Sequence, residues 1–253
     1  MKKFLIVIII FLLLIISLFL ISRYVGTKGL EVKEYLIINN KLPKSFYGFK
    51  IVHFSDLNYG STIKSINDLK EKVNTINPDI IVFTGNLILK DYKITKEEKD
   101  ELINSLKQLE SKYGNYYILG EDDLDIKILE DSNFKNINTT YDTIINNKFD
   151  EIYLGNIQTE EDYKFKILLI NKPDNITSFE NFDLVLSGHS LKRQINLPLI
   201  NEIFKKKGSI KYYKEFYKVN DMDLYISSGI GTSKIKLRLL NKPSINFYRI
   251  VNK

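Results

Sequence analysis

Apolar runs of strand length alternate with amphipathic helical segments between residues 49 and 123, and this order restricts the fold more than any other feature. The runs with the character of buried strands are residues 49–55, 79–86 and 115–123. Residues 62–77 carry apolar side chains at three- and four-residue spacings, and residues 95–114 start with a threonine and early acids, so each predicts a helix. Strands separated by helices in this way predict a parallel α/β sheet.

The second half of the chain adds further strand-length runs. They span residues 150–157, 163–171, 182–190, 222–231 and 244–251. The 253-residue chain shows no repeat or low-complexity linker, which favours one domain with two facing sheets over residues 46–253. The aromatic segment 211–218 is expected to pack in a hairpin.

Residues 4–22 contain no charged side chain and only two serines. As a helix, such a segment spans about 28 Å, close to the thickness of a bilayer core. It is longer than a secretory apolar region, and no A-x-A cleavage site follows. We therefore predict a transmembrane signal anchor over residues 1–23, an extended connector over residues 24–45, and a single-pass protein of the cell membrane. Basic residues flank the segment on both sides, so their distribution indicates its orientation in the membrane only weakly. An N-terminal anchor with so short an amino side most often leaves the following domain outside the cytoplasm, and this is the location we expect.

The net charge of +6 is unevenly distributed. Residues 190–253 carry 14 basic and 4 acidic residues, whereas residues 1–189 carry 23 basic and 27 acidic residues. The basic second half could contact anionic lipid or a wall polymer, or it could simply be a solvated lysine-rich surface. Basic and aromatic residues are not interleaved, so no nucleic-acid partner is expected. The absence of cysteine excludes disulfide and thiolate chemistry.

Polar motifs follow the predicted strands. They are "SDLN" (55–58), "TGN" (84–86), "LGEDD" (119–123), "LLINKPD" (168–174) and "SGHSLKRQI" (187–195). The carboxyl ends of parallel strands meet at one edge of a sheet, so these motifs are expected to converge in space. Gly85, Gly120 and Gly188 fit the tight turns that such strand ends require.

In this order the five motifs resemble those of the calcineurin-like metallophosphoesterases, whose pattern is D-x-H, G-D, G-N-H-D/E, a lone His before P-D, and G-H-x-H. The flanking segments resemble the membrane-anchored bacterial branch, and the resemblance covers residues 45–251. It implies a four-layer α/β/β/α sandwich, here preceded by one N-terminal transmembrane helix. It also implies two divalent cations that clamp a phosphate and activate a water molecule.

When the family pattern is carried over position by position, this sequence has a different residue at most of the metal-ligand positions. The positions fall at Asp56, Asn58, Asn86, Glu121, Asn171, His189 and Leu191, and a catalytic His of the family corresponds to Asp122. Only Asp56 and His189 match the residues of the family pattern. The position of the carboxylate that the two cations share is held by Asn86.

These replacements affect the two metal positions differently. The first would be served by Asp56, Asn58, Asn86 and Leu191. Leucine cannot coordinate and amides are weak ligands, so this position is expected to be empty. The second would be served by Asn86, Glu121, Asn171 and His189. This oxygen-rich set could hold one hard cation weakly. We expect no resident cofactor, the alternative being a single weakly bound Mn²⁺, Mg²⁺ or Ca²⁺.

The resulting hypothesis is a pseudoenzyme that has lost the two-metal phosphoester hydrolase site. The alternative is an active hydrolase with a rebuilt single-metal site at Glu121 and His189. A third hypothesis is a binder of cations or anionic lipid without phosphoester chemistry. The pair Lys192–Arg193 is expected to add positive charge at the mouth of the site, and His53 is interpreted as a structural histidine.

Overall fold

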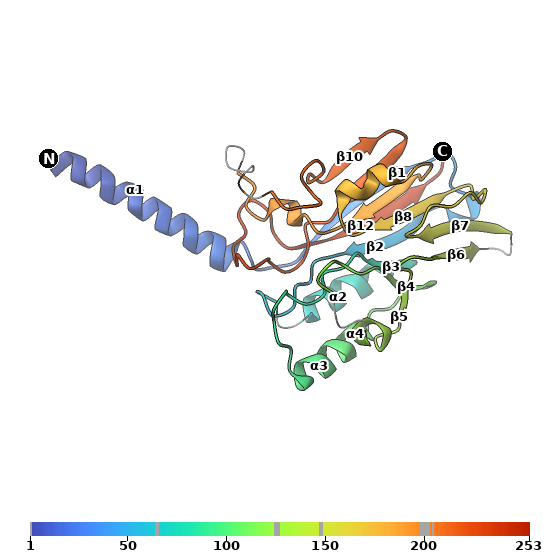
Figure 1. Ribbon diagram of the computed structural model, residues 1–253, viewed down its shortest axis with the longest axis horizontal. Helices are drawn as coiled ribbons and strands as arrows, with labels where there is room; N and C mark the ends of the chain where they lie inside the picture. The colour runs from blue at the N-terminus through green and yellow to red at the C-terminus, as the bar shows by residue number, and fades with distance from the viewer. Residues whose placement is uncertain (1, 64–65, 124–126, 147–148, 198–202, 204) are drawn as a thin grey trace.

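A long N-terminal helix projects from one end of a two-sheet domain in the computed structural model (Figure 1). The structure describes residues 2–63, 66–123, 127–146, 149–197, 203 and 205–253. Helix α1 (Lys2–Leu20) continues as a short π-helical turn, η1 (Ile21–Val25). Together they form a helix that is long and apolar enough to cross a membrane, and its apolar window is not covered by the rest of the chain.

The first sheet has six strands in the order β1-β12-β2-β3-β4-β5. Their bounds are β1 Glu31–Ile38, β12 Ser244–Val251, β2 Phe49–Phe54, β3 Ile80–Phe83, β4 Gly114–Tyr117 and β5 Phe134–Asn136. Strands β2, β3, β4 and β5 pair in parallel, as the alternation of strands and helices predicts. Strand β12 runs antiparallel to β2 and returns the end of the chain to this sheet.

Helices α2 (Asn67–Ile76), α3 (Lys96–Leu106) and α4 (Lys127–Glu130) pack on the outer face of the first sheet. Helix α3 begins with a capping box in which Thr95 and Glu98 bond each other's backbone N–H groups. It ends at Leu106 rather than at Gly114, and after Leu106 the N–H groups of Gln108 and Leu109 bond the carbonyls three residues back and tighten the chain into a turn. Asn74 Nδ2 donates to the Gln108 carbonyl and Asn115 Nδ2 to that of Leu109. The helix predicted over residues 62–77 includes residues 64–65, which lie outside the described residues.

The second sheet also has six strands, in the order β10-β11-β9-β8-β7-β6. Their bounds are β10 Phe216–Val219, β11 Met222–Ile226, β9 Leu184–Ser187, β8 Lys166–Ile170, β7 Asp150–Gly155 and β6 Tyr141–Asn146. The central strands are parallel, whereas β10 and β6 are antiparallel edges. The hairpin expected at residues 211–218 is formed by β10 and β11, slightly later in the chain.

The two sheets face each other across an apolar core. Its members include Ile51, Ile80, Val82, Leu154, Ile167, Leu169, Leu186 and Tyr248. The outer face of the second sheet packs against aromatic side chains and the 3₁₀ turn η3 (Pro173–Ser178). The two-sheet α/β sandwich of the sequence prediction is therefore present, and in the described residues its fourth layer is built from turns and aromatic side chains.

The segment expected as a connector, residues 24–45, contributes a strand to the first sheet. Strand β1 pairs in parallel with β12 from Glu31 opposite Ser244 to Ile38 opposite Val251. Its side chains are mostly exposed, as is usual at the edge of a sheet. The sheet thus begins at Glu31, before the boundary at residue 46.

Candidate functional site at the strand ends

Residues from the ends of β2, β3 and β9 form one hydrogen-bonded group, which joins the two sheets. Asp56 follows β2, Asn86 follows β3, and His189 follows β9. Asn86 Nδ2 donates to Asp56 Oδ1 at 2.6 Å, and the backbone N–H of His189 donates to Asp56 Oδ2 at 2.8 Å. The convergence expected from the parallel sheet therefore brings these three residues together.

The carboxylate of Asp56 is fully buried, and its hydrogen bonds come from inside the protein. Besides the bonds from Asn86 and His189, Oδ2 accepts a 2.6 Å hydrogen bond from Ser55 Oγ. Asp56, Asn86 and His189 all adopt left-handed backbone conformations, with φ of 47°, 64° and 64°. Asp, Asn and His tolerate this region better than most residues, and such conformations cluster at functional sites.

Asp123 organises the turn that carries Asn86, a role that the sequence analysis did not assign to it. Its carboxylate accepts backbone N–H groups of Asn86, Leu87 and Gly120, each at 2.7 Å. Desolvation of this inward-pointing carboxylate raises its pKa, and the three N–H donors oppose that rise. The signal in the sequence is the third acid of "EDD", a pattern that is equally typical of a solvated acidic cluster.

Leu191 fills the space beside Asp56. It is buried, and a Cβ placed on Gly229 would lie 2.5 Å from Leu191 Cδ2 and 2.8 Å from Asp56 Cβ. Asn58 is also buried, and a Cβ on Gly231 would lie 2.9 Å from Asn58 Cβ. The side of Asp56 that faces the loop 229–231 is thus occupied by protein atoms.

Arg238 places a buried positive charge next to this group, and no motif in the sequence indicates it. Its guanidinium donates to the carbonyls of Ser228 at 2.9 Å, Gly229 at 3.0 Å and Asn241 at 3.2 Å. Complete burial lowers the pKa of Arg238 to about 10, and the negative charge of Asp56 opposes this shift. Arg238 is therefore charged at neutral pH and places a positive charge near the carboxylate of Asp56.

His189 and Asn171 each leave one acceptor atom buried. His189 Nε2 bonds the carbonyl of Lys207 at 2.8 Å, so Nε2 carries the proton and Nδ1 is the acceptor. Asn171 Nδ2 donates to the carbonyl of Thr84 at 2.6 Å. In the part of the chain that the structure describes, His189 Nδ1 and Asn171 Oδ1 are buried without a hydrogen-bond partner. Burial and the charge of Lys206 lower the pKa of His189, so it is neutral near pH 7.

Glu121 and Asp122 lie at the rim and pair with lysines. The Glu121 carboxylate is 60% exposed and lies 2.6 Å from Lys172 Nζ, which lowers the pKa of Glu121 through a hydrogen bond and its charge. Asp122 lies 2.8 Å from Lys90 Nζ. Glu121 and Lys172 line an open cavity of about 460 Å³, and its other lining residues include Gly120, Asn156, Asn171 and Phe179.

Lys192 and Arg193 were expected to add positive charge at the mouth of the site, but in the structure both contact neighbouring segments instead. Lys192 pairs with Glu215, and burial lowers its pKa to about 8. Arg193 is buried, and its guanidinium lies 3.6 Å from the ring centroid of Tyr213. Both residues hold the loop after β9 onto neighbouring segments.

His53 is a structural histidine, as predicted. It is fully buried, with Nε2 2.9 Å from Thr84 Oγ1 and Nδ1 3.4 Å from the hydroxyl of Tyr248. Burial lowers the pKa of His53 to about 3, so the ring is neutral.

Metal-binding capacity can be judged from the donors that these residues offer. Over the described residues, no group of three or more His, Asp and Glu side chains is placed to hold a metal ion. The two buried acceptor atoms that could serve as metal ligands are Asn171 Oδ1, an amide oxygen, and His189 Nδ1, a nitrogen of a neutral imidazole. The inner carboxylate, Asp56, already accepts hydrogen bonds on both oxygens.

Comparison with known proteins finds relatives of this chain, most of them bacterial, although no family model matches it. It is 30% identical over 255 residues to "Uncharacterized metallophosphoesterase YkuE" of Bacillus subtilis (strain 168), covering 90% of this chain and 88% of the relative. It is 27% identical over 272 residues to "Uncharacterized metallophosphoesterase" of Helicobacter pylori (strain J99 / ATCC 700824), covering 96% and 70%. The solved structure of TT1561 of Thermus thermophilus is 13% identical with a TM-score of 0.45, covering 72% of this chain and 90% of that one.

Proposed function

Because this chain belongs to the metallophosphoesterase family, we propose that it is a membrane-anchored member that has lost the two-metal phosphoester hydrolase site. In this proposal the protein is a pseudoenzyme, and its role is binding rather than hydrolysis. The fold is retained, and the residues at its strand ends form hydrogen bonds and apolar contacts with one another.

The hydrogen bond from Asn86 to Asp56 is the observation that carries the proposal. Two cations held close together repel each other, and a shared carboxylate offsets that repulsion. Asn86 occupies the position of that carboxylate, and its amide N–H₂ points at Asp56 as a donor. A neutral donor at this place supplies no negative charge, and it competes with any cation for the Asp56 oxygen.

The surroundings of Asp56 favour the same proposal. Leu191 contributes hydrocarbon where the family pattern has a second imidazole, and it packs beside Asp56. Arg238 already supplies a positive charge near the Asp56 carboxylate. A doubly charged ion at the first metal position would therefore meet a filled space and a nearby guanidinium, and this set of residues does not fit the two-cation arrangement.

Proton transfer to a leaving group would also lack its usual donor. Asp122 stands at the position of the assisting His and forms an ion pair with Lys90. An ionised carboxylate cannot donate a proton, and it repels a phosphate unless a cation lies between them. We derive no hydrolytic step from this site.

A second candidate function, hydrolysis at a single-metal site at Glu121 and His189, is favoured by one observation. His189 Nδ1 and Asn171 Oδ1 are buried acceptors without partners among the described residues, and a single cation would satisfy both. Against it, Glu121 points to Lys172, and Lys206 lies close enough to His189 to lower its pKa. These ammonium groups oppose a cation at this place.

Membrane attachment is the other part of the proposal. The helix Lys2–Val25 has the length and composition of a single span. We propose that it is an uncleaved signal anchor that holds the domain outside the cytoplasm. Protease protection in intact cells would test this sidedness, because a domain outside the cytoplasm is digested without permeabilising the membrane.

A hydrolysis assay separates the two candidate functions. The full-length protein in detergent is assayed with bis(p-nitrophenyl) phosphate and added Mn²⁺, Mg²⁺ or Ca²⁺. The pseudoenzyme predicts no turnover above the rate without protein. Turnover that is lost in both Glu121→Ala and His189→Ala, but kept in Glu97→Ala on the exposed start of α3, would establish the single-metal hydrolase instead.

A further inference from the structure

The surface next to the end of the membrane helix combines exposed apolar and basic side chains. We call it the membrane-proximal face, and it consists of Tyr24, Val25, Lys234, Ile235, Lys236 and Leu240. Leu240 is 71% exposed, Val25 59%, Tyr24 58% and Ile235 48%. Large apolar side chains that are exposed together mark surfaces of interaction more often than chance.

The loop that carries this face is bonded directly to the helix. The N–H of Arg238 donates to the carbonyl of Ser22 at 2.9 Å, and Ser22 is buried. A Cβ on Gly26 would overlap the Arg238 carbonyl oxygen, so only glycine permits this approach. The helix end and the loop are therefore in backbone contact, and the position of one determines the position of the other.

This contact determines the height of the face relative to a bilayer. The uncharged helical segment ends at Ser22, and Arg23 and Tyr24 follow, which are residue types that favour the headgroup level. Ile235 and Leu240 are within three residues of Arg238, so they lie within about 10 Å of it along the chain. When the helix spans a membrane, these side chains therefore lie within about 10 Å of the headgroup level.

The charges of this region match an anionic surface. Lys234 and Lys236 are exposed next to Ile235, and Arg23 and Lys28 flank the helix end. Lys234 also pairs with Asp91 at 2.7 Å, but both side chains are 68% exposed and such surface pairs are weak. A basic side chain at the surface of an anionic membrane is attracted by the lipid phosphates.

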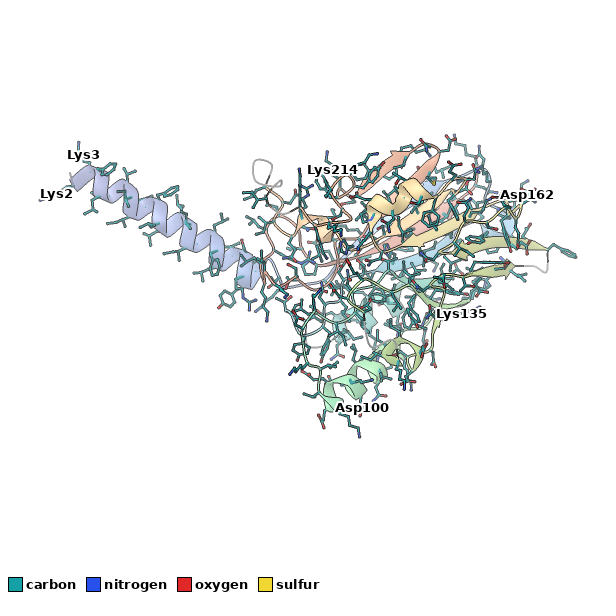
Figure 2. The ribbon with its side chains drawn as sticks, in the orientation of Figure 1. Lys2, Lys3, Asp100, Lys135, Asp162 and Lys214 are labelled. Atoms are coloured by element: carbon teal, nitrogen blue, oxygen red, sulfur yellow. The ribbon has the colours of Figure 1, made fainter. Side chains whose placement is uncertain are left out.

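We propose that the membrane-proximal face docks on an anionic phospholipid bilayer, with Ile235 and Leu240 inserted among the lipid headgroups and Lys234 and Lys236 at their phosphates. The proposal rests on the membrane attachment proposed above, and adds that the domain lies on the lipid surface. Since Arg238 links the helix end to the group around Asp56, docking holds the strand ends near the bilayer. Asp162 lies at the opposite end of the domain from Lys2 and Lys3 (Figure 2).

Single-cysteine labelling tests the docking in the full-length protein, because the natural chain has no cysteine. Leu240→Cys carries an environment-sensitive fluorophore in nanodiscs that contain lipids with a quencher near the headgroup. Asp162→Cys is the matched control at the far end, and Phe11→Cys in α1 reports insertion of the helix. We expect the label at position 240 to be quenched at least about twofold more in phosphatidylcholine–phosphatidylglycerol discs than the label at position 162.

The charge contribution is tested in the same discs. Lys234→Glu together with Lys236→Glu should lower the quenching at position 240, whereas Lys164→Glu, near Asp162, should not. Equal quenching at positions 240 and 162 would overturn the docking. Equal quenching at position 240 in pure phosphatidylcholine would overturn the assignment to anionic lipid. A label at Phe11 that is not quenched in discs whose lipids carry the quencher in the acyl chain would instead contradict membrane attachment itself, so the two failures are distinguishable.

Discussion

Asn86 Nδ2 donates a 2.6 Å hydrogen bond to Oδ1 of Asp56, and this contact joins the end of β3 to the end of β2. In the family pattern the position of Asn86 holds a carboxylate that two cations share. Here a neutral amide and a carboxylate satisfy each other. The hydrogen bonds to both of its oxygens offset the cost of burying the Asp56 carboxylate.

Asn86→Asp should destabilise the protein and make its stability depend on metal. Two adjacent carboxylates repel each other, and we expect a loss of about 2–4 kcal/mol in the free energy of unfolding without metal. Millimolar Mn²⁺ should restore part of this loss in the variant and leave the natural protein unchanged. Urea denaturation with and without Mn²⁺ measures both, and Asn104→Asp on the exposed face of α3 is the control. A variant as stable as the natural protein without metal would show that the amide donor does not matter.

Arg238→Met should be among the most destabilising substitutions. It leaves the carbonyls of Ser228, Gly229 and Asn241 without their donor and removes the positive charge near the Asp56 carboxylate. Breaking a buried charge arrangement costs about 3–5 kcal/mol. Arg249→Met is the control, because Arg249 forms an exposed pair with Glu34 at 3.7 Å and should change stability by less than about 1 kcal/mol. Equal losses in the two variants would refute this role of Arg238.

Asp123→Asn should loosen the turn at Asn86. An amide keeps one acceptor oxygen but directs an N–H₂ group at the backbone N–H groups of Asn86, Leu87 or Gly120. We expect a loss of about 2–3 kcal/mol in unfolding free energy and faster hydrogen exchange at those amides. Asp131→Asn, at an exposed position after α4, provides the comparison. Unchanged exchange at Asn86 and Leu87 would contradict the assignment.

Glu215 predicts a specific pH dependence of stability. Burial alone would raise its pKa, but hydrogen bonds from Lys192 and Tyr35 and the charges of Lys192 and Lys33 outweigh burial and lower the pKa to about 2. A depressed pKa stabilises the fold above the unfolded value near 4.5, and this stabilisation is lost as the pH falls toward 2. Glu215→Gln should therefore cost about 1 kcal/mol at pH 7, after allowance for its partial exposure, and less as the pH falls to 3. Denaturation curves of both proteins across this range give the difference directly, and a constant difference would contradict it.

The strands and their convergence were predictable because their signal is local. The apolar runs that became β2, β3, β8 and β9 end in polar motifs, and parallel pairing brings such ends together. Strand β1 was not predicted as part of the sheet, since its side chains are mostly exposed and its partner β12 lies at the other end of the chain. Segments that pair across so large a separation in the sequence leave no local pattern that predicts the pairing.

The site was predictable in composition but not in its internal bonds. The motifs identified Asp56, Asn86 and His189, yet the direction of the Asn86 amide depends on contacts with β2 that only the fold supplies. Arg238 lies far from "SDLN" in sequence and belongs to no motif, so its proximity to Asp56 required the structure. Glu121 stands at a ligand position of the family pattern, and its pairing with Lys172 depends on the fold rather than on any local motif.

The metal content of the full-length protein tests the central claim most directly. The purified protein is equilibrated with Mn²⁺, separated from free metal by gel filtration, and analysed for manganese and protein in the same fractions. The closed group around Asp56 predicts less than about one Mn²⁺ per chain, with no change in Asp56→Asn. About two Mn²⁺ ions per chain, reduced in Asp56→Asn and His189→Ala, would contradict the account.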